Sequence, residues 1–432
     1  MKSVSTNKLS TIIILLFSLI LLGNTKIHSS PNDINIVDTY GQLSVSGNRI
    51  VNQHGDPVAL RGMSLYWSQW IGKYYNYDCI KWLRDDWKCT VVRAAMAVES
   101  GGYLNNPAVE KAKIEAVADA CIDLGIYVII DWHDHNAHLH QAQAVSFFKQ
   151  MAEEYGEYPN VLYEIYNEPL QISWPNLVKP YSQAVTDSIR TIDPDNIVLV
   201  GSPTWSQDVD VASLSPLTGS NIAYTLHFYA ATHKQSIRNK ALTALNNGVA
   251  LFVSEFGTCE ASGSGAINAT ELNLWYKLMD DNIISWCNWS IADINETSAA
   301  LLPGASATGN WPTNKISQSG TIIRSRLNSL NGPIFSPIED QNQAVLRPSS
   351  IHQFPNPVQS TAQFQFQLLT PQIVRLEIYN LLGQKVTTLL NSPFQLGTYT
   401  LAFDLNNLPS GTYFYCFQTA ESVEMKRLQI VR

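Results

Sequence analysis

The chain has 432 residues, and its hydrophobic content of 45% is enough for a large core, which excludes a wholly disordered protein. Its formal net charge of −8 argues against a nucleic-acid backbone as the main partner. Charged residues make up only 15% of the chain, whereas it has 11 tryptophans and 19 tyrosines, a composition that suits a neutral, hydroxylated ligand. The sequence motifs of P-loop nucleotide sites, zinc ribbons and zincins do not occur.

Residues 1–28 have the order of a secretory signal peptide, in which charged residues precede a short apolar run. Lys2 and Lys8 come first, and residues 11–22 are almost wholly apolar. This run is shorter than the roughly 20 residues that a membrane-spanning helix needs, so a retained anchor is the less favoured alternative. We therefore expect export, with cleavage within residues 25–31.

Export would place the six cysteines in an oxidising compartment. Their spacing matches no metal-binding pattern. Cys79 and Cys89 flank one short amphipathic segment and are candidates for a disulfide bond, whereas Cys121 lies on an apolar helix face and is expected to be a small buried residue.

Between Val58 and about Leu330, short apolar runs alternate with amphipathic stretches of helical periodicity. The runs are almost continuously apolar, as is typical of parallel strands that are covered on both faces. Eight such runs, each followed by a crossover, predict an α/β fold, a (β/α)8 TIM barrel, with a hairpin over residues 41–57 before its first strand. An open doubly wound sheet is the alternative, but it would normally carry a glycine fingerprint after its first strand. The predicted strands are 58–65, 90–98, 127–134, 161–169, 197–203, 222–230, 249–257 and 283–291.

Residues 331–350 lose this periodicity and contain Gly-Pro, Ser-Pro and a polar run, which predicts a linker. Beyond it, short alternating segments separated by turn residues predict a small, all-β antiparallel sandwich over residues 351–432. The segments are 361–369, 373–380, 384–390, 397–404, 411–419 and 423–431.

The same C-terminal region contains Phe354-Pro355-Asn356-Pro357 and the segments 378–386 and 408–413. On these motifs it resembles the sorting domain of type IX secretion. The resemblance implies passage across an outer membrane, with the type IX secretion machinery as a partner and the outer cell surface or the medium as the destination. The alternative is a generic β-sandwich that binds sugar, but no exposed aromatic row on its predicted strands supports this alternative.

Polar residues gather at the C-terminal ends of the predicted barrel strands, the face on which barrels of this kind carry their active sites. Two of them are carboxylates, Glu168 at the end of the fourth strand and Glu255 at the end of the seventh, on opposite sides of the barrel mouth. Two carboxyl groups that face each other across a cleft can cleave glycosidic bonds. For either glutamate alone, an ordinary ion-paired loop residue is the alternative. The strand-end residues are Arg93, His133, Asn167, Glu168, Pro169, His227, Tyr229, Glu255 and Trp289.

Taken in order, these strand-end residues resemble glycoside hydrolase family 5, and the likeness spans residues 40–330. Further stretches resemble its secreted endoglucanase branch, subfamily 2. These stretches are Gly62-Met63-Ser64, Trp70, Asp131-Trp132-His133 and residues 296–301.

The resemblance implies a retaining mechanism in which Glu168 is the acid/base, Glu255 is the nucleophile and the two carboxyl groups lie about 5 Å apart. Ionised Glu255 would then raise the pKa of Glu168 and keep this acid protonated. Arg93 and Tyr229 would hold Glu255 charged by donating hydrogen bonds. Asn167 would bind the sugar hydroxyl beside the reacting carbon.

The resemblance also implies which residues bind the sugar chain. Histidines would contact hydroxyl groups or adjust the carboxylates, and aromatic side chains would pack against pyranose faces. Many relatives carry a lysine where Ile294 stands, and that lysine reaches a flanking sugar, so this departure leaves the flanking subsite open. The implied substrate-binding residues are Arg93, His133, Asn167, His227, Tyr229, Trp289, Trp70, Tyr66 and Glu296.

Four histidines lie within eight residues, at positions 133, 135, 138 and 140, which raises the alternative of a metal site. Apart from two nearby aspartates, the segment lacks the carboxylates that orient metal-binding histidines. We therefore expect His133 to contact substrate, the other three to belong to a loop, and the protein to need neither a metal nor a cofactor.

These features predict a secreted, monomeric, retaining endo-β-1,4-glucanase that acts on cellulose or related β-glucans and has no stable membrane span. A β-mannanase or another β-1,4-glycanase on the same barrel is one alternative. A surface glycan-binding protein without turnover is the other, but a pure binder has no need of two facing carboxylates.

Overall fold

The computed structural model describes residues 35–335, 351–354, 357–368, 371–380, 384–419 and 423–432. The predicted signal peptide and the part of the predicted linker over residues 336–350 lie outside the described residues. Within the described ranges, no helix is both long and apolar enough to cross a membrane.

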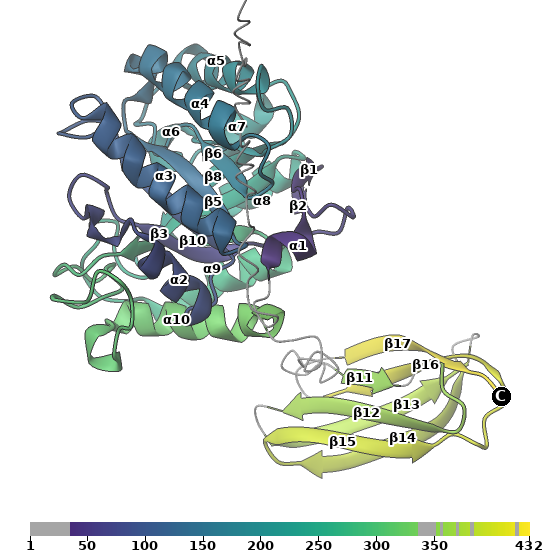
Figure 1. The fold of residues 1–432 in the computed structure, drawn as a ribbon. Coiled ribbons are helices and arrows are strands. Elements are labelled where there is room, and N and C mark those ends of the chain that lie inside the picture. The colour runs from purple at the N-terminus through teal and green to yellow at the C-terminus, as the bar shows by residue number, and fades with distance from the viewer. Residues whose placement is uncertain (1–34, 336–350, 355–356, 369–370, 381–383, 420–422) are drawn as a thin grey trace, which may run out of the picture. The chain divides into compact units, whose positions relative to one another are not determined.

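A closed barrel of eight parallel strands forms the larger domain (Figure 1). The ring closes where the last strand, β10, pairs with the first, β3. Each strand coincides with one of the eight apolar runs, so the prediction of a (β/α)8 barrel is confirmed and an open doubly wound sheet is excluded. The strands are β3 (Arg61–Leu65), β4 (Val91–Ala97), β5 (Tyr127–His133), β6 (Val161–Glu164), β7 (Val198–Val200), β8 (Ile222–Tyr229), β9 (Ala250–Gly257) and β10 (Ser285–Ile291).

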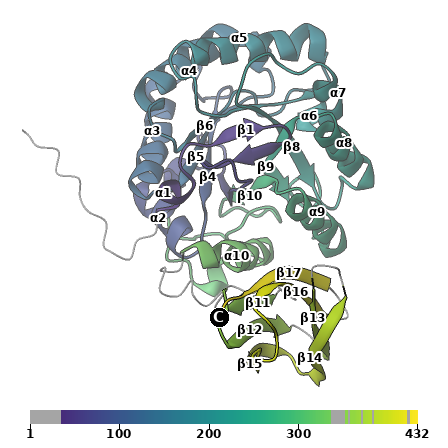
Figure 2. The ribbon, with the colours of Figure 1, turned by 90° about the vertical axis from the view of Figure 1, so that its right-hand side faces the viewer.

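Helices surround the strands (Figure 2), which is why every residue of β4, β5, β9 and β10 is buried. Local signals set their ends. Asn76 caps α2 by accepting a hydrogen bond from the main-chain nitrogen of Cys79, and Pro107 begins α3. The helices are α1 (Ile36–Tyr40), α2 (Tyr77–Asp85), α3 (Pro107–Asp123), α4 (Gln141–Tyr155), α5 (Lys179–Arg190), α6 (Pro203–Ser206), α7 (Val209–Leu214), α8 (Gln235–Asn246), α9 (Ala269–Asp281) and α10 (Gln318–Asn331).

The predicted hairpin is present as β1 (Ser44–Ser46) and β2 (Arg49–Val51). Its main chain and side chains bind residues that precede the barrel strands: the nitrogen of Val45 donates to Asn221, and Asn48 donates to the carbonyl of Leu245. The hairpin therefore covers the N-terminal end of the barrel and leaves the C-terminal end of the strands open.

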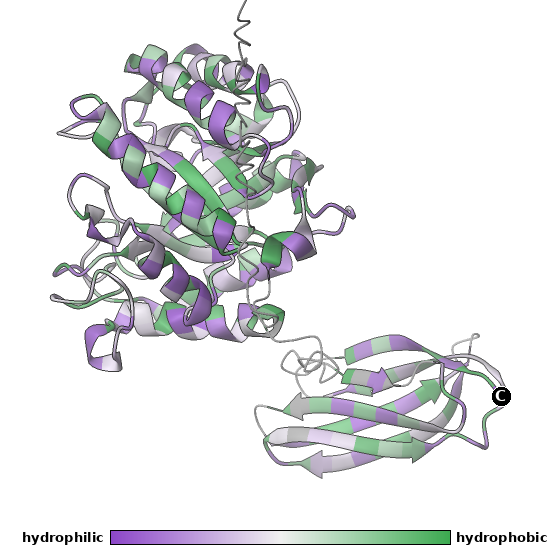
Figure 3. Cartoon of the chain, viewed as in Figure 1, coloured by the Kyte–Doolittle hydropathy of each residue, from purple (hydrophilic) through white to green (hydrophobic). Residues whose placement is uncertain are grey.

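The C-terminal residues form two antiparallel sheets, in the orders β11-β12-β15 and β14-β13-β16-β17. The sheets share one apolar core, in which Phe364 contacts Tyr415 with ring centroids 5.1 Å apart. Apolar and polar residues alternate along these strands (Figure 3), so the predicted sandwich is confirmed. Only β11, which is short and ends before Pro355, was not among the predicted segments. The strands are β11 (Ile351–Phe354), β12 (Thr361–Leu368), β13 (Gln372–Tyr379), β14 (Lys385–Phe394), β15 (Gly397–Asp404), β16 (Gly411–Gln418) and β17 (Val423–Ile430).

All six cysteines lie in the described part of the chain, and all are free thiols. Cys79 and Cys89 are both free and fully buried in the barrel domain's core, so the structure does not contain the candidate disulfide bond between them. Cys121 is buried as a small core residue, as predicted.

Candidate active site

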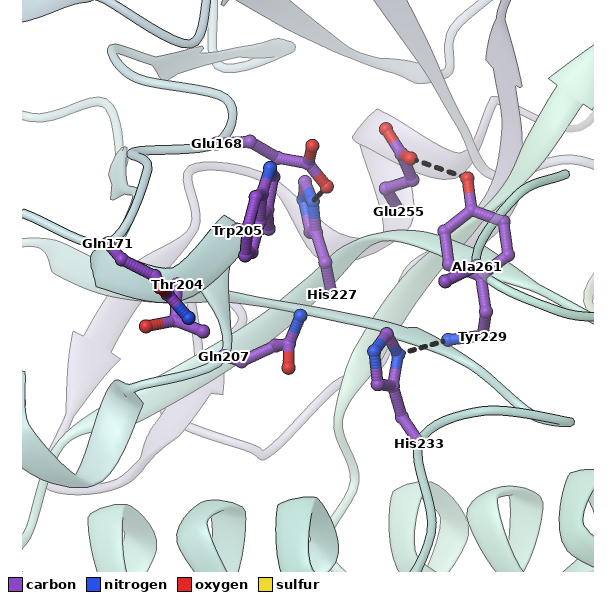
Figure 4. A pocket seen from close by; sticks show the side chains of 10 residues that line it. All are labelled: Glu168, Gln171, Thr204, Trp205, Gln207, His227, Tyr229, His233, Glu255 and Ala261. Carbon is purple, nitrogen blue, oxygen red and sulfur yellow. Dashed lines mark hydrogen bonds and ion pairs between the residues drawn. The ribbon is translucent and has the colours of Figure 1, made fainter.

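A cavity of about 480 Å³ opens at the C-terminal ends of the barrel strands (Figure 4). Glu168 follows β6, Glu255 lies on β9, and the side chain of His227 from β8 lies between them. The barrel therefore brings together carboxylates that are far apart in the sequence. The lining residues are Glu168, Gln171, Thr204, Trp205, Gln207, His227, Tyr229, His233, Glu255 and Ala261.

The two carboxylates lie close to each other. One carboxylate oxygen of Glu168, one of Glu255 and a ring nitrogen of His227 all lie within 4.8 Å of one another. This spacing agrees with direct attack by one carboxylate, for which the groups lie about 5 Å apart. It is shorter than the roughly 6.5–9.5 Å that leaves room for an attacking water.

Glu255 is held by two donors. Nη1 of Arg93 donates to its Oε2 over 3.2 Å, and the hydroxyl of Tyr229 donates to its Oε1 over 2.8 Å. Burial and the neighbouring charge of Glu168 raise the pKa of Glu255 above its ordinary value, against the lowering effect of Arg93 and Tyr229. The donors fix the position of the carboxylate while its surroundings make it more basic.

Glu168 is held by two imidazoles. Its Oε1 lies 2.9 Å from Nδ1 of His227, and its Oε2 lies 3.2 Å from Nε2 of His135. Burial raises the pKa of Glu168, but the hydrogen bonds and charges of His135 and His227 outweigh burial and lower it to about 2. In the same way, the bonds to Glu164 and Glu168 overcome burial and raise the pKa of His227 to about 9.

The expectation that the pKa of Glu168 is raised is therefore wrong, because its pKa is lowered. Glu255 lies near Glu168, as expected, but it is Glu168 that raises the pKa of Glu255, whereas two imidazoles bind Glu168 directly and lower its pKa. The raised pKa of His227 and the lowered pKa of Glu168 favour the charged pair, imidazolium and carboxylate, across this 2.9 Å contact.

Behind the carboxylates lies a buried network around Arg93, which has no exposed surface. Its Nε donates to Oε2 of Glu164 over 2.7 Å, and its Nη2 lies 2.9 Å from Oδ2 of Asp131. Glu164 in turn accepts a hydrogen bond from Ser254, which also contacts His227. The network links five strands, β4, β5, β6, β8 and β9, and holds the guanidinium that binds Glu255.

Sequence analysis assigned no role to Glu164, Asp131 or Ser254. The signal that could have found them is a charged or polar residue inside an otherwise apolar strand, because such a group needs a buried partner. Asp131 also binds the predicted residue His133, whose Nδ1 lies 2.7 Å from Oδ2. Burial and the nearby charge of Arg93 lower the pKa of His133 well below its ordinary value, so this imidazole is neutral.

Aromatic side chains lie beside the carboxylates. The ring of Trp289 stacks on His133 with an interplanar angle of 5° and contacts Tyr66 at 5.2 Å between centroids. Trp70 is 58% exposed and contacts Trp67, which sequence analysis missed. Trp67 and Trp70 border a second cavity of about 200 Å³. Its lining residues are Trp67, Gln69, Trp70, Glu99, Ser100, His133, Asp134 and His135.

The two remaining predicted residues differ in how they are placed. Asn167 is almost fully buried, and its Oδ1 accepts a hydrogen bond from Nη2 of Arg93 over 2.6 Å. Glu296 lines neither of these two cavities; its Oε2 accepts a bond from Ser298, and burial raises its pKa. Only Asn167 is joined to the network behind the carboxylates by a direct hydrogen bond.

The four clustered histidines do not converge. His133 binds Asp131, His135 binds Glu168, His138 binds Tyr166 and His140 binds Asp134. Among the described residues, two sets of side chains are close enough to share a cation. One is the pair of carboxylates with His227, and the other is Glu99, Asp134 and His140.

Comparisons with known proteins agree with this geometry. Residues 51–295 match the cellulase family, glycosyl hydrolase family 5, and residues 352–431 match a secretion system C-terminal sorting domain. Endoglucanase Z of Dickeya dadantii is 50% identical over 292 residues, which cover 66% of this chain and 66% of the relative. An endoglucanase of Clostridium saccharobutylicum is 47% identical over 295 residues, which cover 67% of this chain and 66% of the relative. The chain thus spans 66% of the length of these relatives.

Solved structures are similar over the barrel. A structure from Cytophaga hutchinsonii has 55% sequence identity and a TM-score of 0.69, with 70% of this chain and 99% of that chain covered. The catalytic domain of Thermobifida fusca endoglucanase Cel5A has 33% identity and a TM-score of 0.66, with 68% of this chain and 100% of that chain covered.

Proposed function

The chain belongs to glycosyl hydrolase family 5 and carries a secretion system C-terminal sorting domain, and from this premise we propose that it is a secreted, retaining endo-β-1,4-glucanase. Its substrate would be cellulose or a related β-glucan. The observation that carries the proposal is the pair of carboxylate oxygens, from Glu168 and Glu255, that lie within 4.8 Å of each other in a cavity at the barrel mouth.

In the first step, Glu255 attacks the anomeric carbon while Glu168 donates a proton to the departing glycosidic oxygen. The bond to that oxygen breaks, and a glycosyl ester forms on Glu255. In the second step, Glu168 removes a proton from a water molecule, which attacks the anomeric carbon and releases the sugar and the carboxylate. Two inversions give net retention.

The proton for the first step comes from the hydrogen bond between Glu168 and His227. Transfer over the 2.9 Å from Nδ1 of His227 to Oε1 of Glu168 converts an ion pair into a neutral pair without changing the total charge of the site. A leaving oxygen placed against Glu168 then takes this proton. His135, on the other carboxylate oxygen, holds the orientation of the group.

The remaining residues orient the nucleophile or bind the substrate. Arg93 and Tyr229 hold the Glu255 carboxylate in position by hydrogen bonds. Asn167, itself held by Arg93, binds the sugar hydroxyl beside the reacting carbon. The rings of Trp289, Tyr66 and Trp70 provide apolar faces for pyranose rings. His133, kept neutral by burial, and Glu296 bind hydroxyl groups.

Export is served by both ends of the chain. The domain arrangement that we propose is a signal peptide over 1–28, a catalytic barrel over 40–330, a linker over 331–350 and a sorting domain over 351–432. The match of residues 352–431 to a sorting domain supports type IX machinery as the export partner and the cell surface or medium as the destination. Deleting residues 345–432 should retain the protein in the cell and leave its hydrolytic activity unchanged.

The closest competing substrate is mannan, because recognition of an equatorial or axial hydroxyl depends on loop shape. The names of the two relatives reported above, both endoglucanases, favour glucan. The test is release of reducing sugar from carboxymethylcellulose, mannan and xylan side by side. Release from carboxymethylcellulose is expected. Release of reducing sugar from mannan alone would overturn the assignment of a glucan substrate. No release from any of the three polysaccharides would favour a glycan-binding protein.

A further inference from the structure

The short element α6 (Pro203–Ser206), which follows β7 at the edge of the larger cavity, is a left-handed turn and not a regular α-helix. Thr204, Trp205 and Ser206 have φ angles of 59°, 54° and 57°. None is glycine, so each occupies a conformation that its Cβ disfavours. Three such residues in succession persist only where the surrounding structure holds them, and backbone of this kind clusters at functional sites.

Main-chain groups of the turn bind the segment that follows Glu168. The nitrogen of Trp205 donates to the carbonyl oxygen of Pro169 over 2.8 Å, and the nitrogen of Thr204 donates to that of Leu170 over 3.1 Å. A right-handed turn would aim these N–H groups elsewhere. The unusual conformation therefore serves the contact with the loop that carries the acid/base.

Ser206 binds the residue that precedes Glu168. Its hydroxyl donates to the carbonyl oxygen of Asn167 over 2.7 Å and lies 3.1 Å from Oγ1 of Thr225, a donor on β8. Ser206 has no exposed surface and does not line the cavity. Together with the bonds to Pro169, this contact fixes the main chain on both sides of Glu168.

The middle residue of the turn faces the cavity. Trp205 is 38% exposed and lines the cavity with Glu168 (Figure 4). Thr204 also lines the cavity, and its Oγ1 donates to Oδ2 of Asp208 over 2.7 Å, while Asp208 pairs with Lys240. The same turn thus holds both the indole and the acid/base loop.

We infer that Ser206 is a positioning residue for Glu168, acting through the main chain of Asn167. This inference rests on the proposed function, since it assigns Ser206 to the proton-transfer half of the reaction. Proton transfer to a leaving oxygen requires the carboxyl within hydrogen-bond reach of that oxygen, so a small displacement of the loop slows it. Attack by Glu255, held by other strands, does not depend on Ser206.

The test is Ser206→Ala, assayed by kcat/KM on a cello-oligosaccharide and on 2,4-dinitrophenyl β-cellobioside. Loss of one buried hydrogen bond should lower kcat/KM on the oligosaccharide by about tenfold. The dinitrophenyl substrate should change less than about twofold, because its leaving group departs without a proton. Ser206→Gly, which also lacks the hydroxyl but adopts a positive φ freely, should give the same pattern and stands in if the alanine variant does not fold.

Ser202→Ala is the matched control. Ser202 lies four residues earlier and is equally buried, and its hydroxyl has no hydrogen-bond partner among the described residues. This variant should match the wild type on both substrates. If kcat/KM of the Ser206 variants falls equally on both substrates, or falls on neither, the inference is overturned. The proposed function is unaffected by that result as long as the wild type is active. A wild type inactive on both would overturn both proposals.

Discussion

The mouth of the barrel and the core of the C-terminal sandwich bury different kinds of side chain. At the mouth, Arg93, Asp131 and Glu164 are fully buried, and Arg93 binds both carboxylates. In the described part of the sandwich, the core consists of side chains such as Phe364 and Phe417, and Thr419 is the only buried residue with a polar side chain apart from the hydroxyl of Tyr415.

This difference in buried side chains indicates that the barrel mouth, and not the sandwich, is the catalytic region. Burying charge is costly unless every charged group is paired, whereas burying aromatic and aliphatic side chains is favourable by itself. In the barrel, the fully buried cluster of Arg93, Asp131 and Glu164 lies at the end that carries the carboxylates. Substitutions that change charge but not volume should therefore damage the mouth, and substitutions that change volume should damage the sandwich.

The largest effect is expected at Glu255. Glu255→Gln keeps the volume and removes the nucleophile, so hydrolysis of carboxymethylcellulose should fall by at least about 10³-fold. Trapping of a glycosyl-enzyme by a fluorinated glycoside, followed by mass spectrometry, should also disappear. Glu260→Gln, the same change at an exposed residue of the following loop, is the control. A trapped adduct that persists in Glu255→Gln would refute the assignment of the nucleophile.

Glu164→Gln tests the buried network without changing its volume. The substitution removes one of the carboxylates that neutralise the buried Arg93 guanidinium. This loss should lower the free energy of unfolding of the barrel by about 3–5 kcal/mol. Activity should fall as well, since Arg93 also holds Glu255. Thermal unfolding followed by circular dichroism gives the first effect. A melting temperature equal to that of the wild type would show that the network contributes nothing to stability.

Phe364→Ala is the counterpart in the sandwich. Removing this buried ring should destabilise the C-terminal domain by about 3–5 kcal/mol through lost packing and an unfilled cavity. The kcat on carboxymethylcellulose should stay unchanged. Limited proteolysis of the C-terminal region reports the first effect. A parallel loss of kcat would show that the sandwich belongs to the catalytic unit.

The smallest and most specific effect concerns pH. His227 has its pKa raised to about 9, so the pair that it forms with Glu168 keeps its proton up to that pH and kcat/KM should fall above it. Toward acid, Glu255 must stay ionised to attack, and because its pKa is raised, the acid limb should lie above its ordinary value of 4.5. In His227→Asn the alkaline limb should move to lower pH. An unmoved limb would place the transferable proton elsewhere.

The fold and the two carboxylates were accessible from the sequence, but their electrostatics were not. Continuous apolar runs such as residues 127–134 predict buried parallel strands, and their ends mark the active face. Glu164 stands within such a run, and its sequence neighbours do not reveal that it faces Arg93. His135 was assigned to a loop, yet it binds Glu168 and helps to reverse the expected pKa.

The left-handed turn at residues 204–206 was equally hidden. Turns of this hand are usually predicted from glycine or asparagine, and this segment contains neither. Its conformation is imposed by contacts with the loop after β6, which are distant in sequence. Long-range contacts of this kind decide the geometry of the site without leaving a local signal.

The stereochemistry of the first sugar released tests the central claim most directly. Proton NMR of a cello-oligosaccharide digest, recorded before mutarotation, distinguishes the two anomers at the newly formed reducing end. A double displacement at Glu255 gives the β-anomer first, with the α-anomer growing in later. Initial release of the α-anomer would mean a single displacement by water and would contradict the account.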